Sequence, residues 1–388
     1  MSATELLATL VAIDSVNPSM AAGQGEAVLA GWVADFGRRC GAQVTLEEVL
    51  PGRPNARLVL PPSDGSQGEP TRRLLFDIHL DTVPLDTMPD ALTPRVEGGR
   101  LWGRGACDTK ASLTAALLAF ERLAGSGTRR AGEICLLCTV DEEYQKRGIA
   151  HAVQAGLTAD AAIVGEPTNL QPVIAHKGAL RWRLSTIGRA AHTSRPENGN
   201  NAIYQMVEVI DWLRERIEPQ LATLSHPRLT PPTLTVGRIE GGVGVNIVPA
   251  RCTIEIDRRT LPQEDLQQIL AELDGLLAEL MRRRPEIRVE REAPFLSERG
   301  LETPPEAPVV SAVRRACADV LGPGAHTEPV GVPYGTDATH LRGIPTVVLG
   351  PGDIAQAHSA EEWVDLTQVE QAVEVYYRVM ASFVAGEW

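Results

Sequence analysis

The sequence predicts an α/β protein in which a mostly parallel sheet, flanked by helices, forms a discontinuous domain interrupted by an inserted α+β domain. Three observations predict this fold. The chain has 388 residues, which is too long for one ordinary hydrophobic core. Apolar runs typical of buried strands alternate with helical runs in its first part. The middle of the chain then changes to half-buried strands and two long helices.

In the N-terminal part, the sequence predicts the alternation of strands and helices that parallel sheets require. Helices are expected at 4–16, 26–40, 110–123 and 148–155. Apolar strands are expected at 56–60, 74–79, 133–140 and 161–164. The segment 61–70 is rich in Pro, Ser and Gly and predicts a surface loop.

The middle of the chain predicts a separate α+β unit. Strands are expected at 180–188, 233–240 and 250–259, and helices at 201–216 and 264–284. A helix at 307–321, a strand at 346–349 and a helix at 366–385 then return to the first pattern. We therefore assign residues 1–177 and 295–388 to one domain and residues 178–294 to an insertion.

Composition excludes several classes of protein. The chain is 43% hydrophobic and 22% charged, which is typical of globular proteins, and its net charge of -13 argues against nucleic-acid binding. We find neither an apolar run of about 18 residues nor a secretory signal, so we expect no membrane span. Six scattered cysteines indicate reduced thiols and a cytoplasmic protein. Cys135 and Cys138 lie in one predicted strand and face opposite ways, which disfavours a shared metal or a disulfide.

Five separated residues could jointly bind two divalent metal ions. They are His79, Asp108, Glu143, Glu166 and His358. Two imidazoles and three carboxylates suit zinc, cobalt or manganese. If one carboxylate bridges the ions, each ion keeps one His, one further carboxylate and open positions for water and substrate. Each residue alone is usually a solvated or hydrogen-bonded side chain, but buried acidic residues are rare unless paired or metal-bound, and several acidic residues follow apolar strands here. The joint pattern therefore predicts a dinuclear metal site at one edge of the sheet.

Two more acidic residues have positions suited to supporting roles. His79 and Asp81 are alternate residues of one strand, so Asp81 can accept the second imidazole N–H. Glu142 and Glu143 are adjacent and point differently, so one can bind metal while the other acts as a base.

Taken in order, these motifs resemble the dinuclear metallohydrolases that include acetylornithine deacetylase, succinyl-diaminopimelate desuccinylase, aminoacylase and the glutamate carboxypeptidases. The resemblance runs over nearly the whole chain. It rests on residues 79–81, 105–110, 141–143, 166–168, 188–196 and 357–359. Residues 177–178 and 195–203 are most similar to the acetylornithine deacetylase-like enzymes.

The resemblance implies a role for each candidate ligand. Asp108 would bridge two metal ions, most simply zinc, with cobalt or manganese as alternatives. His79 and Glu166 would complete one site, and Glu143 and His358 the other.

The resemblance also implies catalytic residues outside the metal ligands. Glu142 would be the general base on the water between the two ions, and Asp81 would hold His79. The insertion would form a homodimer, and His192 would cross to the partner's site to stabilise the tetrahedral oxyanion. A surface histidine in a polar loop is the alternative for His192. Cys107 and Lys110, which flank Asp108, are interpreted as packing or surface residues.

Two residues resemble the family's substrate-binding positions, and two more could line the substrate pocket. Asn246 lies in a Gly-rich loop, and Arg259 ends a strand where it could bind the substrate carboxylate. We choose Arg259 over Arg258 by the motif, and a solvated arginine is the alternative. Gly335 and Thr336 could line the pocket, and Thr336 is equally suited to cap a helix.

The predicted function is hydrolysis of the amide bond of an N-acyl amino acid. A carboxypeptidase or dipeptidase acting on short peptides would use the same ligands, so the ligands do not separate the two. A non-catalytic metal-binding protein is the third alternative, and Glu142 argues against it because such a protein needs no base.

Overall fold

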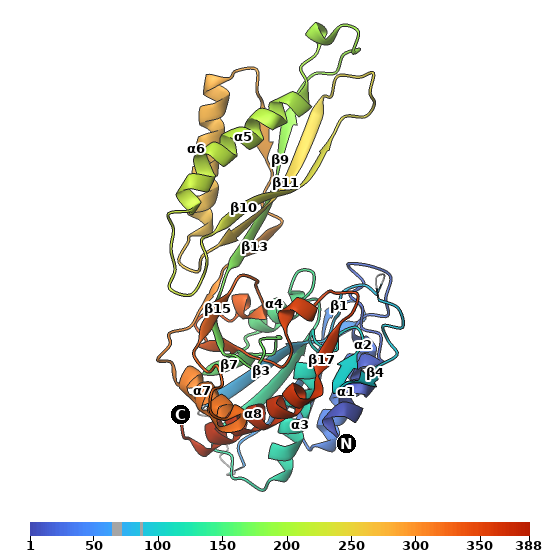
Figure 1. The fold of residues 1–388 in the computed structure, drawn as a ribbon, viewed down its shortest axis with the longest axis vertical. Helices are drawn as coiled ribbons and strands as arrows, with labels where there is room; N and C mark the ends of the chain where they lie inside the picture. The colour runs from blue at the N-terminus through green and yellow to red at the C-terminus, as the bar shows by residue number, and fades with distance from the viewer. Residues whose placement is uncertain (64–71, 86–87) are drawn as a thin grey trace. The chain divides into compact units, whose positions relative to one another are not determined.

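The computed structural model describes residues 1–63, 72–85 and 88–388, and its chain forms two compact units. The first unit comprises Met1–Ile174, Thr303–Val330 and Thr336–Trp388, and the second comprises Ala175–Glu302 and Gly331–Gly335. Figure 1 shows the elements of both units. Most of the predicted loop at 61–70 lies outside the described residues.

The first unit is built on a sheet whose inner strands are parallel. Its strands follow the order β1-β2-β6-β3-β7-β16. They are β1 (Gln43–Leu50), β2 (Arg53–Leu60), β3 (Arg73–His79), β6 (Glu133–Thr139), β7 (Ala161–Val164) and β16 (Thr346–Val348). Strands β6, β3, β7 and β16 are parallel neighbours, whereas β1 and β2 form an antiparallel edge. Beyond β16, Val173 of β8 (Val173–His176) pairs antiparallel with Val348.

Helices cover this sheet because their apolar sides share one core with alternate residues of β2, β3 and β6. They are α1 (Ala3–Val11), α2 (Ala27–Arg39), α3 (Lys110–Gly125), α7 (Pro308–Leu321) and α8 (Leu366–Ala385). Helices α3 and α8 lie side by side (Figure 1). Helix α4 (Arg147–Gln154) follows β6. Short strands β4 (Arg95–Glu97), β5 (Arg100–Trp102) and β17 (Trp363–Asp365) form a small antiparallel sheet that the sequence analysis did not predict.

The second unit is an antiparallel sheet with two helices on one face. The strand order is β10-β11-β9-β12, and β13 also pairs with β9. The strands are β9 (Gly178–Ile187), β10 (Thr233–Gly241), β11 (Arg251–Thr260), β12 (Val289–Arg291) and β13 (Leu296–Glu298). Helices α5 (Ala202–Leu221) and α6 (Leu266–Arg283) pack on Trp182, Leu184 and Ile254 of the sheet. Short elements complete the chain: η1 (Pro196–Asn198), β14 (Leu301–Glu302), β15 (Val330–Val332), η2 (Asp337–His340) and η3 (Ile354–Gln356).

The predicted fold class is confirmed: a largely parallel α/β sheet flanked by helices and an α+β insertion. Antiparallel strands at the edges are the main addition. Cys135 and Cys138 are both buried and free, and only Cys138 packs into the main core. Among the described residues, no helix is both long enough and apolar enough to cross a membrane.

Candidate metal centre

Parallel strands bring three of the candidate ligand segments to one edge of the first unit's sheet. His79 is the last residue of β3 and lies level with Thr139, the last residue of β6. Residues 141–143 follow β6, and Glu166 lies just beyond the end of β7. Because parallel neighbours end at the same edge, the residues that follow them converge there.

Asp108 reaches this edge from a glycine-rich loop that leads into α3. Gly105 in this loop has a φ of 80°, and a Cβ there would lie 2.8 Å from the side chain of Thr82. Glycine is therefore needed for both the backbone conformation and the close approach. The Asp108–Thr109 peptide bond is cis. The Thr109 hydroxyl donates to the carbonyl of Gly165, which joins the loop to the residue before Glu166.

The carboxylate of Asp108 lies between two imidazoles. His79 Nε2 is 3.1 Å from Asp108 Oδ1, and His358 Nε2 is 3.4 Å from Asp108 Oδ2. Glu166 Oε2 lies 3.8 Å from His79 Nε2, and Glu143 Oε2 lies 3.0 Å from His358 Nε2. The structure thus brings all five predicted ligands together, in the two pairs that the resemblance implied.

Potential ligand atoms gather closely enough to hold metal ions. In the described part of the chain, two groups of ligand atoms lie within 4.8 Å of one another: His79, Asp108 and Glu143, and His79, Glu142 and Glu166. His79, Asp108 and Glu166 are buried, whereas the side chain of His358 is 56% exposed. His358 has a φ of 60°, in the left-handed region that non-glycine residues rarely adopt. Because the side chain of His358 is largely exposed, one edge of the cluster is open to solvent.

The pKa values of the side chains in the cluster show how burial and neighbouring charges act on them. Burial and the charge of Asp108 together raise the pKa of Glu143 to about 8, although the hydrogen bond from His358 opposes the shift. Burial also raises the pKa of Glu166 well above its usual value. Burial opposes ionisation of Asp108 too, but hydrogen bonds from His358 and His79 lower its pKa. The same hydrogen bonds to Asp108 and Glu143 raise the pKa of His358 to about 10.

Asp81 holds the neighbouring strand end rather than the imidazole. Its Oδ1 accepts from the Glu142 N–H at 3.0 Å, and its Oδ2 accepts from the Glu143 N–H at 3.1 Å and from Asn17 Nδ2 at 2.8 Å. His79 Nδ1 instead lies 2.9 Å from the backbone carbonyl of Asp81 and 3.7 Å from its carboxylate. The expected contact with His79 is therefore made by the main chain, because the carboxylate is already engaged by three donors.

A buried polar network that the sequence analysis missed supports the same strand end. Arg53 is paired with Glu26 and lies 3.1 Å from Asp141 Oδ1. Asn17 Nδ2 donates to Asp141 as well as to Asp81. Asp141 has a φ of 69°, and this network surrounds it at the turn that leads to Glu142. In the sequence, Asn17 and Pro18 mark only the end of a predicted helix, which gives no indication that Asn17 belongs to this network.

Glu142 and Thr336 also belong to the first unit. Glu142 is 8% exposed, and Lys146 Nζ lies 3.3 Å from its Oε1. Thr336 is buried and caps η2, accepting from the Ala338 N–H at 3.2 Å. Of the two interpretations of Thr336, capping is the one for which the structure contains a contact.

The other predicted site residues lie in the second unit. His192 is exposed, its Nδ1 is 2.7 Å from Ser194 Oγ, and it forms a β-bridge with Ile247. The Thr193 N–H donates to the carbonyl of Asn246. The loops that carry His192 and Asn246 are therefore adjacent. Gly335 is the last residue of this unit.

Arg258 and Arg259 face opposite sides of the second unit's sheet. Arg258 is buried on the face that α5 and α6 cover, and its Nη2 pairs with Glu264. Arg259 Nε lies 2.9 Å from Asp257 Oδ1 on the other face, and its side chain is 32% exposed. Arg259 is therefore the more exposed of the two arginines.

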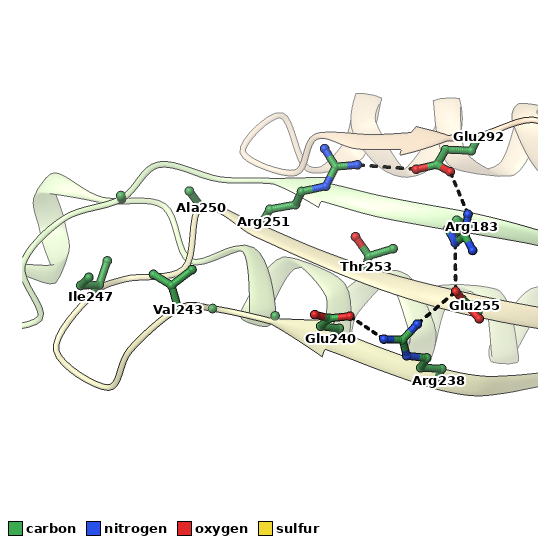
Figure 2. Close-up of a pocket in the computed structure, with 13 residues that line it drawn as sticks. Arg183, Arg238, Glu240, Val243, Ile247, Ala250, Arg251, Thr253, Glu255 and Glu292 are labelled. Atoms are coloured by element: carbon green, nitrogen blue, oxygen red, sulfur yellow. Dashed lines mark hydrogen bonds and ion pairs between the residues drawn. The ribbon is translucent and has the colours of Figure 1, made fainter. Parts of the chain in front are cut away.

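The open face of this sheet also carries a groove of about 570 Å³. Figure 2 shows that its charged side chains alternate in sign across the strands. Glu255 lies between Arg183, at 2.9 Å, and Arg238, at 3.5 Å, while Glu292 lies 3.7 Å from both Arg183 and Arg251. These charges neutralise one another, and none of the predicted site residues lines the groove.

Comparison with known proteins agrees with this fold. A sequence model of peptidase family M20/M25/M40 matches residues 75–382. The aminopeptidase PepT from Bacillus cereus has a similar structure, with a TM-score of 0.78 and 21% identity over 98% of this chain and 99% of that one. A tripeptidase from Staphylococcus aureus has a TM-score of 0.80 and 20% identity over 99% and 98%. A dinuclear metal-binding peptidase from Bacillus subtilis has a TM-score of 0.72 and 13% identity over 99% and 98%.

The fold and the family match define a metallopeptidase-type hydrolase that acts on amide or peptide bonds. The chain belongs to peptidase family M20/M25/M40. The predicted resemblance is thereby confirmed at the level of the family.

Proposed function

We propose that this protein hydrolyses the amide bond of an N-acyl amino acid at a centre of two divalent metal ions. Zinc is the proposed metal, with cobalt and manganese as alternatives. The observation that carries the proposal is the position of Asp108, whose two oxygens face His79 and His358 at 3.1 and 3.4 Å. A carboxylate that faces two imidazoles in this way is placed to be shared by two ions.

The residues fit such a centre on chemical grounds. Two imidazoles and three carboxylates supply the nitrogen and oxygen donors that zinc and its neighbours prefer. Glu143 Oε1 is buried and has no hydrogen-bond partner among the residues that the structure describes. A buried carboxylate oxygen without a donor is unfavourable unless a cation reaches it. Asp108 would contact both ions, with His79 and Glu166 on one and Glu143 and His358 on the other.

The ions would supply a polarised substrate carbonyl and a more acidic water. The chain's own contribution is the placement of Glu142, which neighbours His79 and Glu166 in the cluster. Glu142 would take the proton of the attacking water and deliver it to the nitrogen of the departing amine. Asp81 would keep Glu142 in place, because its carboxylate binds the main-chain N–H groups of Glu142 and Glu143.

The second unit would supply substrate contacts and the oxyanion donor. We propose that His192 stabilises the tetrahedral oxyanion in the partner subunit of a homodimer. Asn246 and Arg259 would bind the substrate carboxylate, and the exposure of Arg259 beside the buried Arg258 supports this choice. Gly335 and Thr336 would line the substrate-binding pocket. The free cysteines support a reducing compartment, and we place the protein in the cytoplasm.

A carboxypeptidase or dipeptidase activity is the second candidate. The names of several similar structures favour it, because they include a metallo-carboxypeptidase from Sulfolobus solfataricus and human carnosine dipeptidase 1. A substrate panel separates the two candidates. Metal-free protein would be given zinc, cobalt or manganese and assayed for release of free amine from N-acetyl and N-succinyl amino acids, dipeptides and tripeptides. Faster turnover of peptides than of every acyl amino acid would replace the deacylase proposal with the peptidase one.

A further inference from the structure

Glu362 is a buried carboxylate that receives four N–H donors from the loop that presents Asp108. Its Oε2 accepts from Arg104 Nη1 at 2.8 Å and from the Gly105 N–H at 2.9 Å. Its Oε1 accepts from the Cys107 N–H at 2.9 Å and from the Asp108 N–H at 3.0 Å. The residue is 1% exposed. Both oxygens are therefore fully used, and three of the four donors are main-chain groups.

The backbone of this loop is shaped to receive an anion. Gly103 and Gly105 both have positive φ values, 154° and 80°, which turn successive N–H groups toward one side. Two other N–H groups of the loop bond locally, from Ala106 to the Gly103 carbonyl and from Lys110 to the Gly105 carbonyl. Without the carboxylate, three buried N–H groups would lose their partner, which is among the more costly defects inside a protein.

Glu362 also belongs to the chain segment that supplies the second imidazole. It lies four residues after His358, and its backbone carbonyl accepts from the Gly103 N–H at 3.1 Å. The Asp108 loop and the His358 segment are thus joined through both the side chain and the main chain of one residue. These are the two segments whose side chains meet at 3.4 Å in the cluster.

We propose that Glu362 is a positioning residue that sets Asp108 between the two metal ions. This inference rests on the proposed dinuclear function. A shift of the Asp108 main chain would move a ligand of both ions at once, so loss of Glu362 should weaken binding of both. Partners that orient metal ligands typically change metal affinity by about 10–100-fold.

Glu362→Gln is the direct test, because the amide keeps one acceptor oxygen and turns an N–H₂ group toward two N–H donors. Glu264→Gln is the matched control: Glu264 is a partly buried carboxylate in the second unit that accepts from the buried Arg258 and from the Leu261 N–H. Both variants disturb a buried ion pair together with a main-chain contact. Only Glu362→Gln disturbs the loop that presents Asp108.

Metal binding to chelator-treated protein would be measured by competition with a chromophoric zinc chelator, and the coordination geometry by the visible spectrum of the cobalt form. We expect Glu362→Gln to weaken both zinc sites by about tenfold or more and to alter the cobalt spectrum. We expect Glu264→Gln to lower the melting temperature while leaving affinity and spectrum unchanged. If Glu362→Gln does not fold, Glu362→Asp replaces it, since it keeps the charge but withdraws the oxygens from the loop.

Three results have distinct meanings. Wild-type affinity and an unchanged cobalt spectrum in a folded Glu362 variant would overturn the positioning role while leaving the proposed function intact. Equal loss of affinity in Glu264→Gln would also overturn it, because a general loss of stability would then explain the effect. A wild-type protein that binds none of zinc, cobalt and manganese would refute the proposed function itself, and this inference with it.

Discussion

Lys110 carries a buried charge whose effect on stability can be worked out from the structure. It is the first residue of α3 and is 1% exposed, and its Nζ donates to the carbonyl of Ile13 at 2.8 Å. Burial lowers the pKa of this ammonium from 10.5 to about 8, although the charges of Glu362 and Asp14 oppose the shift. We predict that Lys110→Met will change how the stability of the protein depends on pH.

The direction of this pH dependence follows from proton binding in the folded and unfolded states. Between the folded pKa and the unfolded pKa, the unfolded chain binds more protons at Lys110 than the folded protein does, so stability rises with pH. One pKa unit corresponds to about 1.4 kcal/mol. The free energy of unfolding of the wild type, relative to Lys110→Met, should therefore rise by about 2.5 kcal/mol between about pH 7 and about pH 10.

Urea unfolding of both proteins in the presence of a chelator, at several pH values in this range, would measure the difference. Every other titrating group is common to the two proteins, so its contribution cancels in the comparison. The methionine keeps the length and apolar volume of the side chain, which limits the packing change. A difference that stays constant to within about 0.5 kcal/mol across the range would refute the reasoning, because Lys110 would then have the same pKa folded and unfolded.

The remaining predictions concern the proposed centre. Chelation should abolish activity, and re-addition of a divalent ion should restore it; full activity in metal-free protein would contradict this prediction. Metal binding should release protons to the buffer, because the raised pKa values of Glu143 and His358 leave protons on these ligands at neutral pH. Isothermal titration in buffers of different ionisation enthalpy measures that proton release. Glu142→Gln should bind zinc normally and lose about 10²–10⁴-fold in kcat, so a variant within about threefold of wild type would exclude Glu142 as the base. His192→Ala should lose about 10²–10³-fold in kcat. Mixing it with Glu142→Gln under proven subunit exchange should restore activity if His192 acts across a dimer, and no recovery would place its action, if any, in its own subunit.

Much of the fold could be predicted because local patterns and the tertiary structure agree. The apolar runs around Phe76 and Leu136 are long enough to be recognised as buried strands, and the alternation around Trp182 marks a sheet with one covered face. Strand β1 was missed because its alternation of exposed and half-buried residues at an antiparallel edge is weak. Strands β4, β5 and β17 have three residues each, too few to show any period.

The candidate ligands could be predicted for a related reason. His79 and Glu166 are polar residues at or just beyond the ends of apolar strands, which makes them visible in the sequence. Glu362 gives no such signal. It stands in an exposed-looking run of polar residues, and its partners are main-chain N–H groups more than 250 residues away, as the separation of 254 from Asp108 illustrates. The contact between the Asp81 carboxylate and the N–H groups of Glu142 and Glu143 was hidden for the same reason, since main-chain donors have no sequence signature.

The charges of the cluster give an independent reason to expect cations in it. Carboxylates lie close together in both groups of ligand atoms, Asp108 with Glu143 and Glu142 with Glu166, at a largely buried edge where like charges repel strongly and are poorly hydrated. In the protein alone, protons relieve these unfavourable charges: burial and the charge of Asp108 raise the pKa of Glu166, and hydrogen bonds to Asp108 and Glu143 raise the pKa of His358 to about 10. Protons on these residues occupy the lone pairs that a metal ion would use. Two dications would replace these protons and neutralise the carboxylates more completely, which supports the proposed binding of divalent ions at this cluster.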